Sequence, residues 1–122
     1  MKAQYSEEYY RKNWERFMRP VPGNHYINLE AELERRMQVY EGIGLPEAMM
    51  SILRKGEAQK VADACKALVT KELELVKGLE NGTASLGYTT QGQEIKARGE
   101  LRTRFEFNCL QYADFKKKYE VA

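Results

Sequence analysis

The chain has 122 residues, a mass of 14.2 kDa and a formal net charge of +2. At this length we expect a single domain with a modest core, which leaves little room for a deep enzyme cleft. Charged residues make up 31% of the chain and apolar residues 43%, so it is too apolar to be disordered. The nearly balanced charge provides no general argument for a nucleic-acid partner.

An amphipathic helix is predicted near the start of the sequence. Ser6 is a suitable N-cap, and two glutamates follow it, where they favour the positive end of the helix dipole. Tyr10, Trp14 and Phe17 then fall on one helical face, and Pro20 ends the helix.

A linker and a larger helical unit follow this first helix. Residues 20–27 are rich in Pro, Gly and Asn and are predicted to separate an N-terminal arm, residues 1–19, from a helical domain, residues 28–122. Within a single globular unit, Asn28 is expected to cap a helix that runs to about Glu41.

A short, separate helix is predicted next. It begins at Pro46, which the first helical turn tolerates, and ends near Gly56. Because it is apolar nearly all round, we expect it to be wedged between other helices.

A long antiparallel hairpin is predicted over residues 57–119. Apolar residues recur at steps of three and four from Glu57 to Leu79, and a second helical pattern runs from Gln91 to about Tyr119. Asn81-Gly82 suits a C-cap and Thr90 an N-cap. The register that matches most apolar positions gives these pairs: Cys65 with Cys109, Leu68 with Phe105, Glu72 with Arg102, and Leu79 with Ile95.

The predicted fold class is therefore all-α. We expect a small helical bundle dominated by the long hairpin, with two shorter helices and the N-terminal helical arm. No segment alternates with period two for long enough to be a convincing strand.

No motif predicts catalysis, a cofactor or a metal. The one histidine, His25, has no nucleophile motif near it, and a bundle metal site of the di-iron kind needs Glu-x-x-His, which is absent from the sequence. The glycines form no phosphate-binding motif. Cys65 and Cys109 are expected to be reduced, buried thiols. We therefore predict a protein that is not an enzyme, located in the cytoplasm.

The arm mixes aromatic and basic residues, the types that dominate interface hot spots. Two other interpretations stay open: the aromatic side chains pack on the chain's own bundle, or they stack on single-stranded nucleic acid. The residues expected to contact a protein partner are Tyr10, Trp14, Arg16, Phe17 and Arg19.

Arg98 and Arg102 share a helical face and are candidates for contacting an anion. The alternative is structural, because the expected register places Arg102 opposite Glu72 and an interhelical ion pair would fix that register. Several aromatic residues of the last helix form a broad stripe, which we expect to contact either the first two helices or another subunit, so a homo-oligomer is one expectation.

The segment TTQGQEIKARGELRTRFEFNCL resembles the C-terminal hairpin of small helical proteins from the structural-gene regions of tailed bacteriophages. The matching positions are Gln93 to Leu101, with Ile95, Ala97, Gly99 and Leu101. The resemblance implies an accessory protein of head, connector or packaging assembly, located in the host cytoplasm or the virion, and transfers no catalytic residues.

The function expected from these observations is non-enzymatic protein–protein interaction, within a larger assembly or with a second copy. One alternative is a nucleic-acid-associated packaging or regulatory protein. Another is a small inhibitor of a host enzyme.

Overall fold

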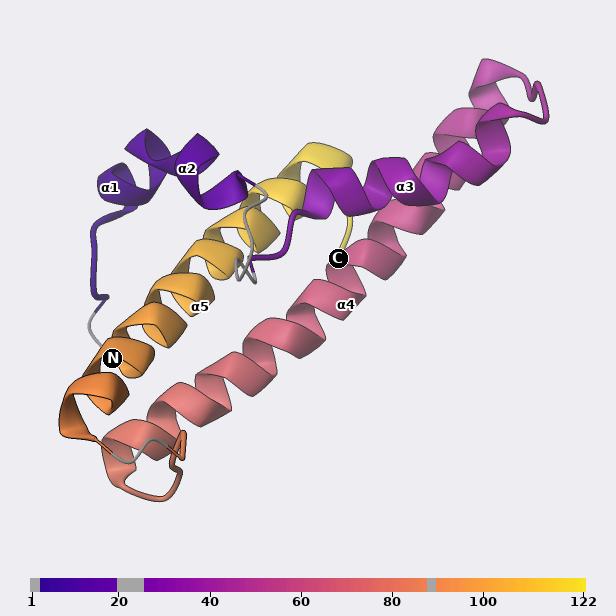
Figure 1. Cartoon of the computed structure of the whole chain (residues 1–122). Helices are drawn as coiled ribbons and strands as arrows, with labels where there is room; N and C mark the ends of the chain where they lie inside the picture. Colours follow the sequence, from indigo (N-terminus) through magenta and orange to yellow (C-terminus); the bar gives the residue numbers. More distant parts are fainter. Residues whose placement is uncertain (1–2, 20–25, 88–89) are drawn as a thin grey trace.

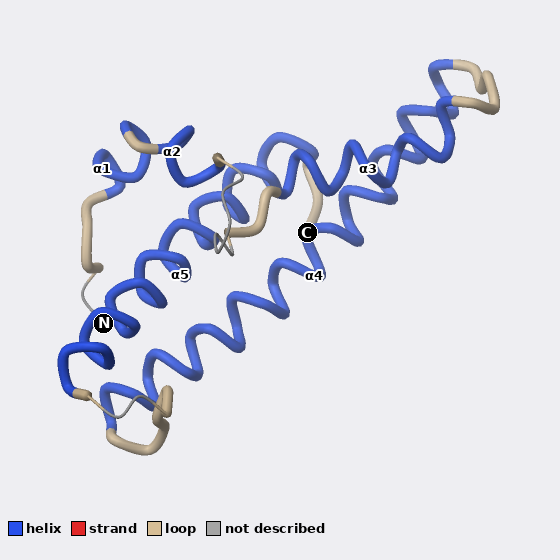
Figure 2. Tube along the Cα trace, viewed as in Figure 1, coloured by secondary structure: helices blue, strands red, loops and turns tan. Residues whose placement is uncertain are grey.

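The computed structural model describes residues 3–19, 26–87 and 90–122, which form an all-α bundle (Figures 1 and 2). The described residues contain no strand, as the sequence predicted. No helix among them is long and apolar enough to cross a membrane. The helices are α1 (Glu7–Lys12), α2 (Trp14–Met18), α3 (Leu29–Glu41), α4 (Glu47–Asn81) and α5 (Gln91–Tyr119).

The architecture is an antiparallel pair, α4 and α5, with α3 packed across the first part of α4 and α1–α2 beside α5 (Figure 1). Beyond the end of α5, the chain turns back to α4, where Gln59 and Ala122 exchange two hydrogen bonds. The connection between α3 and α4 projects past this point, away from the rest of the molecule (Figure 2). We call residues 39–56 the tip.

The prediction of a separate helix ending near Gly56 was wrong, because α4 runs unbroken through that residue. A mid-helix glycine costs about 1 kcal/mol relative to alanine but does not by itself end a helix. Packing on both sides of Gly56 outweighs that cost, because Leu53 and Ala58 contact the same core cluster. The expected wedged position was also wrong, since Met49 and Ile52 are exposed.

The predicted first helix is divided in two at Asn13. Its backbone leaves the helical region there, and its side-chain amide donates a hydrogen bond to the carbonyl of Tyr9 at 2.8 Å. Asparagine competes in this way for backbone groups that a continuous helix would use. The Ser6 cap was predicted correctly, since its hydroxyl accepts a hydrogen bond from the backbone N–H of Tyr9.

The end of α4 matches the expected C-cap. Gly82 has a φ of 74°, a left-handed conformation that favours glycine, and the N–H groups of Thr83 and Ala84 both donate to the carbonyl of Gly78. The loop thus folds back tightly on the helix. A Cβ added at Gly78 would lie 2.8 Å from that of Ala84.

Three apolar clusters hold the helices together. The largest joins α3, α4 and the end of α5, the second joins the arm to Phe107 of α5, and the third lies at the opposite end of the hairpin. The buried members of the largest cluster are Leu29, Leu33, Met37, Ala58, Val61, Ala62, Cys65, Val69 and Phe115.

The hairpin register differs from the predicted one towards the loop. Leu79 shares a cluster with Leu101, whereas Ile95, its expected partner, is 62% exposed. Nearer the open end the expectation agrees better, since Cys65 and Cys109 both pack in the largest cluster and each has a free thiol. Burial raises the pKa of Cys65 to about 12 and that of Cys109 to about 11, so both thiols are protonated at neutral pH.

Candidate interaction surfaces

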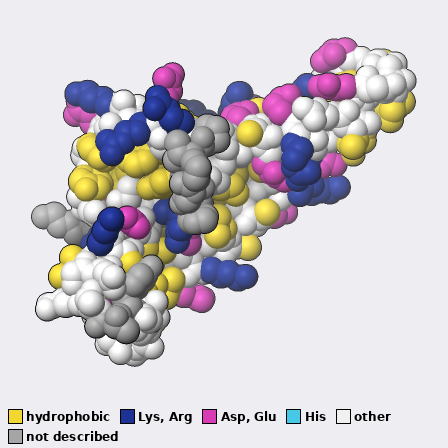
Figure 3. Space-filling model, viewed as in Figure 1, with side chains coloured by type: hydrophobic (Ala, Val, Ile, Leu, Met, Phe, Trp, Pro, Cys, Tyr) yellow, Lys and Arg dark blue, Asp and Glu magenta, His cyan; other side chains and the backbone are white. Residues whose placement is uncertain are grey.

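The tip carries most of the large apolar side chains that the described part of the chain leaves in water. Six such side chains are exposed, and four of them belong to the tip. They are Val39 (70% exposed), Ile43 (63%), Met49 (49%) and Ile52 (73%). Figure 3 shows hydrophobic atoms gathered at the projecting end, with acidic atoms beside them. Sequence reasoning missed this surface because it expected the helix from Pro46 to be enclosed.

A buried carboxylate fixes the base of the tip. Glu57 accepts hydrogen bonds from the hydroxyl of Tyr40 at 2.9 Å and from Nη1 of Arg36 at 3.2 Å, and Lys60 Nζ lies 3.4 Å away. The bond from Tyr40, followed by the bond from Arg36, lowers the pKa of Glu57. Since Tyr40 and Arg36 belong to α3 and Glu57 to α4, these bonds hold the two helices of the tip together.

The expected partner contacts of the arm lie mostly against its own bundle. Tyr10 is 1% exposed and Phe17 8%. Trp14 is half-buried, with its ring centroid 4.6 Å from that of Phe107, while Arg16 and Arg19 are exposed. This arrangement agrees with the alternative that the aromatic residues pack on the chain itself. Whether any of the five contacts a partner stays a prediction.

Glu106 of α5 anchors the arm, and sequence reasoning did not identify it. Its carboxylate accepts hydrogen bonds from the hydroxyl of Tyr10 at 2.7 Å and the backbone N–H of Gln4 at 2.8 Å. Burial, followed by the bond to Glu106, raises the pKa of Tyr10. These partners are about a hundred residues apart in sequence, so no local pattern could reveal them.

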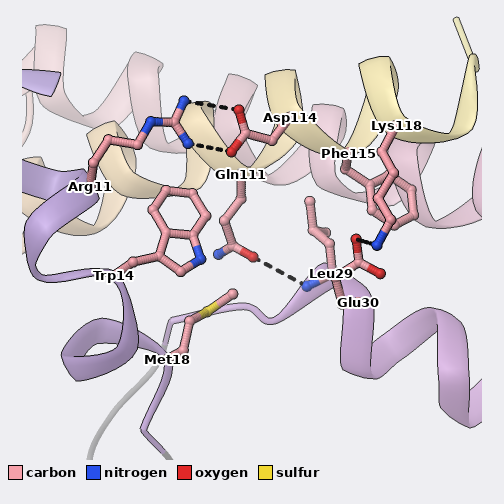
Figure 4. A pocket seen from close by; sticks show the side chains of 9 residues that line it. All are labelled: Arg11, Trp14, Met18, Leu29, Glu30, Gln111, Asp114, Phe115 and Lys118. Atoms are coloured by element: carbon pink, nitrogen blue, oxygen red, sulfur yellow. Dashed lines mark hydrogen bonds and ion pairs between the residues drawn. The ribbon is translucent and has the colours of Figure 1, made fainter. Parts of the chain in front are cut away.

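A pocket of about 390 Å³ lies between the arm, α5 and the start of α3 (Figure 4). Its apolar wall includes Trp14, Met18 and Phe115. Charged pairs border it: Arg11 binds Asp114 through both terminal guanidinium nitrogens, and Lys118 Nζ lies 3.2 Å from a carboxylate oxygen of Glu30.

Gln111 closes the floor of this pocket by binding backbone. Its amide nitrogen donates to the carbonyl of Ile27, and its amide oxygen accepts from the N–H of Leu29 at 3.3 Å. The side chain therefore secures the start of α3 on α5. Gln111 and the four charged side chains that border the pocket already bond to one another or to backbone. The pocket therefore marks the place where the arm, α3 and α5 pack together and is not a good ligand site.

Arg98 and Arg102, the candidate anion contacts, do lie together on a smaller pocket of about 290 Å³. Each has acidic neighbours. Arg98 Nη2 lies 2.9 Å from Glu94, and Arg102 lies 3.6 Å from Glu106 and 3.9 Å from Glu80. These carboxylates offset the positive charge that an anion would need.

The expected pairing of Glu72 with Arg102 was wrong. Glu72 is 5% exposed and accepts a hydrogen bond from Arg104 Nε at 3.1 Å and another from the amide of Asn108 at 3.1 Å. Two polar partners compensate the buried carboxylate better than a single arginine would. The apolar matching used for the register gave no weight to Asn108, which the structure buries completely.

No group of three or more His, Cys, Asp or Glu side chains within residues 3–19, 26–87 and 90–122 is placed to hold a metal ion. His25 lies outside those residues. Comparisons of the chain with models of protein families, with curated proteins and with solved structures find no match.

Proposed function

We propose that this chain is a non-enzymatic interaction protein that joins a larger protein assembly through its tip. The observation that carries the proposal is the exposure of Val39, Ile43, Met49 and Ile52 on the projecting tip. Burying such a side chain contributes roughly 1–3 kcal/mol, so leaving four in water is costly unless another surface covers them. Contiguous exposed apolar surface bordered by charge is typical of protein-binding sites.

The setting we propose is the assembly of a tailed bacteriophage, in its head, connector or packaging apparatus. The support is the resemblance of Gln93–Leu101 to the hairpins of phage accessory proteins. This segment forms the first third of α5, at the far end of the molecule from the tip (Figure 1). Binding through the tip would leave it accessible.

Affinity capture from the organism that encodes the chain tests this function. Tagged wild-type protein should retain specific proteins, and Ile52→Glu or Val39→Glu should lose them. Ile95→Glu is the matched control, because Ile95 is equally exposed but lies on α5 outside the tip. Equal retention by all four proteins would contradict the proposal, provided that circular dichroism shows each variant folded.

Nucleic-acid association is the other candidate, and the same preparations test it. Phosphate contacts release counterions, so binding to DNA or RNA through Arg98 and Arg102 should weaken steeply as salt rises. The carboxylates beside both arginines lead us to expect no such binding. Salt-sensitive binding that Arg98→Ala abolishes would favour the nucleic-acid function instead.

A further inference from the structure

We propose that the tip binds a second copy of this chain, with the first part of α4 packed antiparallel against its counterpart. This inference rests on the function proposed for the tip and names its partner. Three features of the tip support it: the spacing of the exposed residues on α4, a glycine that contacts within the single chain do not explain, and the order of the charges along the tip.

The exposed stripe of α4 has the spacing of a helix-packing seam. On α4, Met49, Ile52 and Gly56 follow one another at steps of three and four residues, the spacing that places side chains along one line of contact between paired helices, and half-buried Leu45 lies just before the helix begins. This seam differs from the one that faces α3, where Met50, Leu53 and Glu57 pack or bond. One helix thus presents two seams, and α3 covers one of them.

The second seam explains the glycine at position 56, whereas no contact among the described residues does. A Cβ added there would meet no atom within 4 Å, and its φ is not in the left-handed region. Neither packing nor backbone conformation within the chain therefore requires glycine, although glycine weakens the middle of a helix. A second helix approaching closely at this point would require it.

A partner related by a two-fold axis presents the same residues in the reverse order. An antiparallel second copy places Met49 against Ile52 of its partner and Leu45 over the partner's Gly56. Each large side chain then meets a small or complementary one. A parallel copy would instead oppose glycine to glycine and leave a gap.

The charges along the tip favour the same orientation. Exposed Glu41 and Glu47 lie at its outer end, and exposed Lys55 and Lys60 lie towards its base. In Figure 3 acidic atoms lie at the end of the tip, and basic atoms lie nearer the body with further acidic atoms among them. Antiparallel pairing brings the acidic end of one copy beside the basic stretch of the other, and parallel pairing opposes like charges.

The surface area that the contact would bury sets the expected affinity of the dimer. At roughly 100 Å² per side chain, Met49 and Ile52 of two copies would bury about 400 Å², and covering Val39 and Ile43 as well would raise this to about 800 Å², still below the lower limit of about 1,200 Å² for specific interfaces. We therefore expect a weak dimer, populated at high micromolar concentration and dissociated near 1 μM.

Sedimentation velocity between about 1 and 500 μM tests the inference, over the range where weak complexes dissociate. The wild-type mass should rise from 14.2 kDa towards twice that value. Ile52→Glu should stay monomeric throughout, and Ile95→Glu should dimerise like the wild type. Gly56→Leu should also stay monomeric without a lower melting temperature, because an added Cβ meets nothing within 4 Å in the single chain and leucine favours a helix more than glycine does.

A charge exchange tests the orientation. Glu41→Lys and Lys55→Glu should each weaken the dimer several-fold, and the double variant should restore it if the helices are antiparallel. A wild-type chain that stays monomeric at 500 μM would overturn the inference. In that case, tip-dependent capture of a different protein would still support the proposed function, so the two failures are distinguishable.

Discussion

At the scale of single residues, Glu106 holds the most separate parts together. It binds the hydroxyl of Tyr10 and the backbone of Gln4 and Tyr5, and it lies near Arg102. Four contacts converge on one carboxylate that is 12% exposed. Removing it would leave the buried Tyr10 hydroxyl without its acceptor, and an unsatisfied buried donor is costly.

We therefore expect Glu106→Ala to lower the free energy of unfolding by about 2 kcal/mol and to loosen the arm first. Trp14, the single tryptophan of the chain, packs on Phe107 and reports arm docking through its fluorescence in a urea titration. Glu100→Ala, at an exposed glutamate of the same helix, is the control. Equal midpoints for the two variants would contradict the role assigned to Glu106.

The capping residues show what local sequence can reveal about single residues. Ser6, Asn28 and Thr90 were predicted as N-caps, and each accepts a hydrogen bond from the backbone N–H three residues later. A cap depends on neighbours within one turn, so its pattern is readable. Glu72 and Glu106 could not be identified in this way, because their partners come from distant parts of the chain.

At the scale of elements, α4 contains two glycines in opposite surroundings. Gly56 has open space around its missing Cβ, whereas at Gly78 that atom would lie 2.8 Å from the Cβ of Ala84. The same substitution at the two positions therefore separates helix propensity from packing.

In the background of Ile52→Glu, chosen to keep the chain monomeric, Gly56→Ala should raise the free energy of unfolding by about 0.5–1 kcal/mol. Gly78→Ala should lower it, because the loop after α4 must move to admit the methyl group. Thermal melts of both variants against their parent provide the comparison. A stabilising Gly78→Ala would show that the loop does not pack on α4 as described.

The hydrogen bonds to Glu57 at the base of the tip make the free energy of unfolding depend on pH. The folded pKa of Glu57 is lowered, so its contribution is complete above the unfolded value of about 4.3 and is lost as pH falls through the folded pKa. Glu57→Gln should cost about 1–2 kcal/mol at pH 7 and should flatten the fall in stability below pH about 4.3. Urea midpoints from pH 7 to pH 3 measure this. Parallel curves for wild type and variant would contradict the assignment.

Helix positions were largely predictable and helix pairing was not. The bounds of α3 and α5 follow from periodicity and caps, which act locally. The register of the hairpin depends on which polar groups must be buried together, and apolar matching assigned Glu72 to Arg102 in place of Arg104 and Asn108. The predicted helix end at Gly56 was wrong for a different reason. Packing on both sides of this residue outweighs the low helix propensity of glycine.

At the scale of the whole molecule, the sequence predicted an exposed, partner-binding arm and a buried helix after Pro46, and the structure shows the reverse burial. Tyr10 and Phe17, expected to contact partners, are buried in the chain's own core, and the helix expected to be enclosed carries Met49 and Ile52 in water. Composition cannot distinguish these cases, because both segments contain many large apolar side chains. Only the relative length of α4 and α5 leaves the tip uncovered.

The most direct test of the tip as a contact surface is hydroxyl-radical footprinting of Met49. The account predicts that Met49, 49% exposed in the single chain, is oxidised readily at 1 μM and is protected in the native assembly or at 500 μM, when label is compared with that on buried Met37. Equal oxidation of Met49 under all three conditions would contradict it.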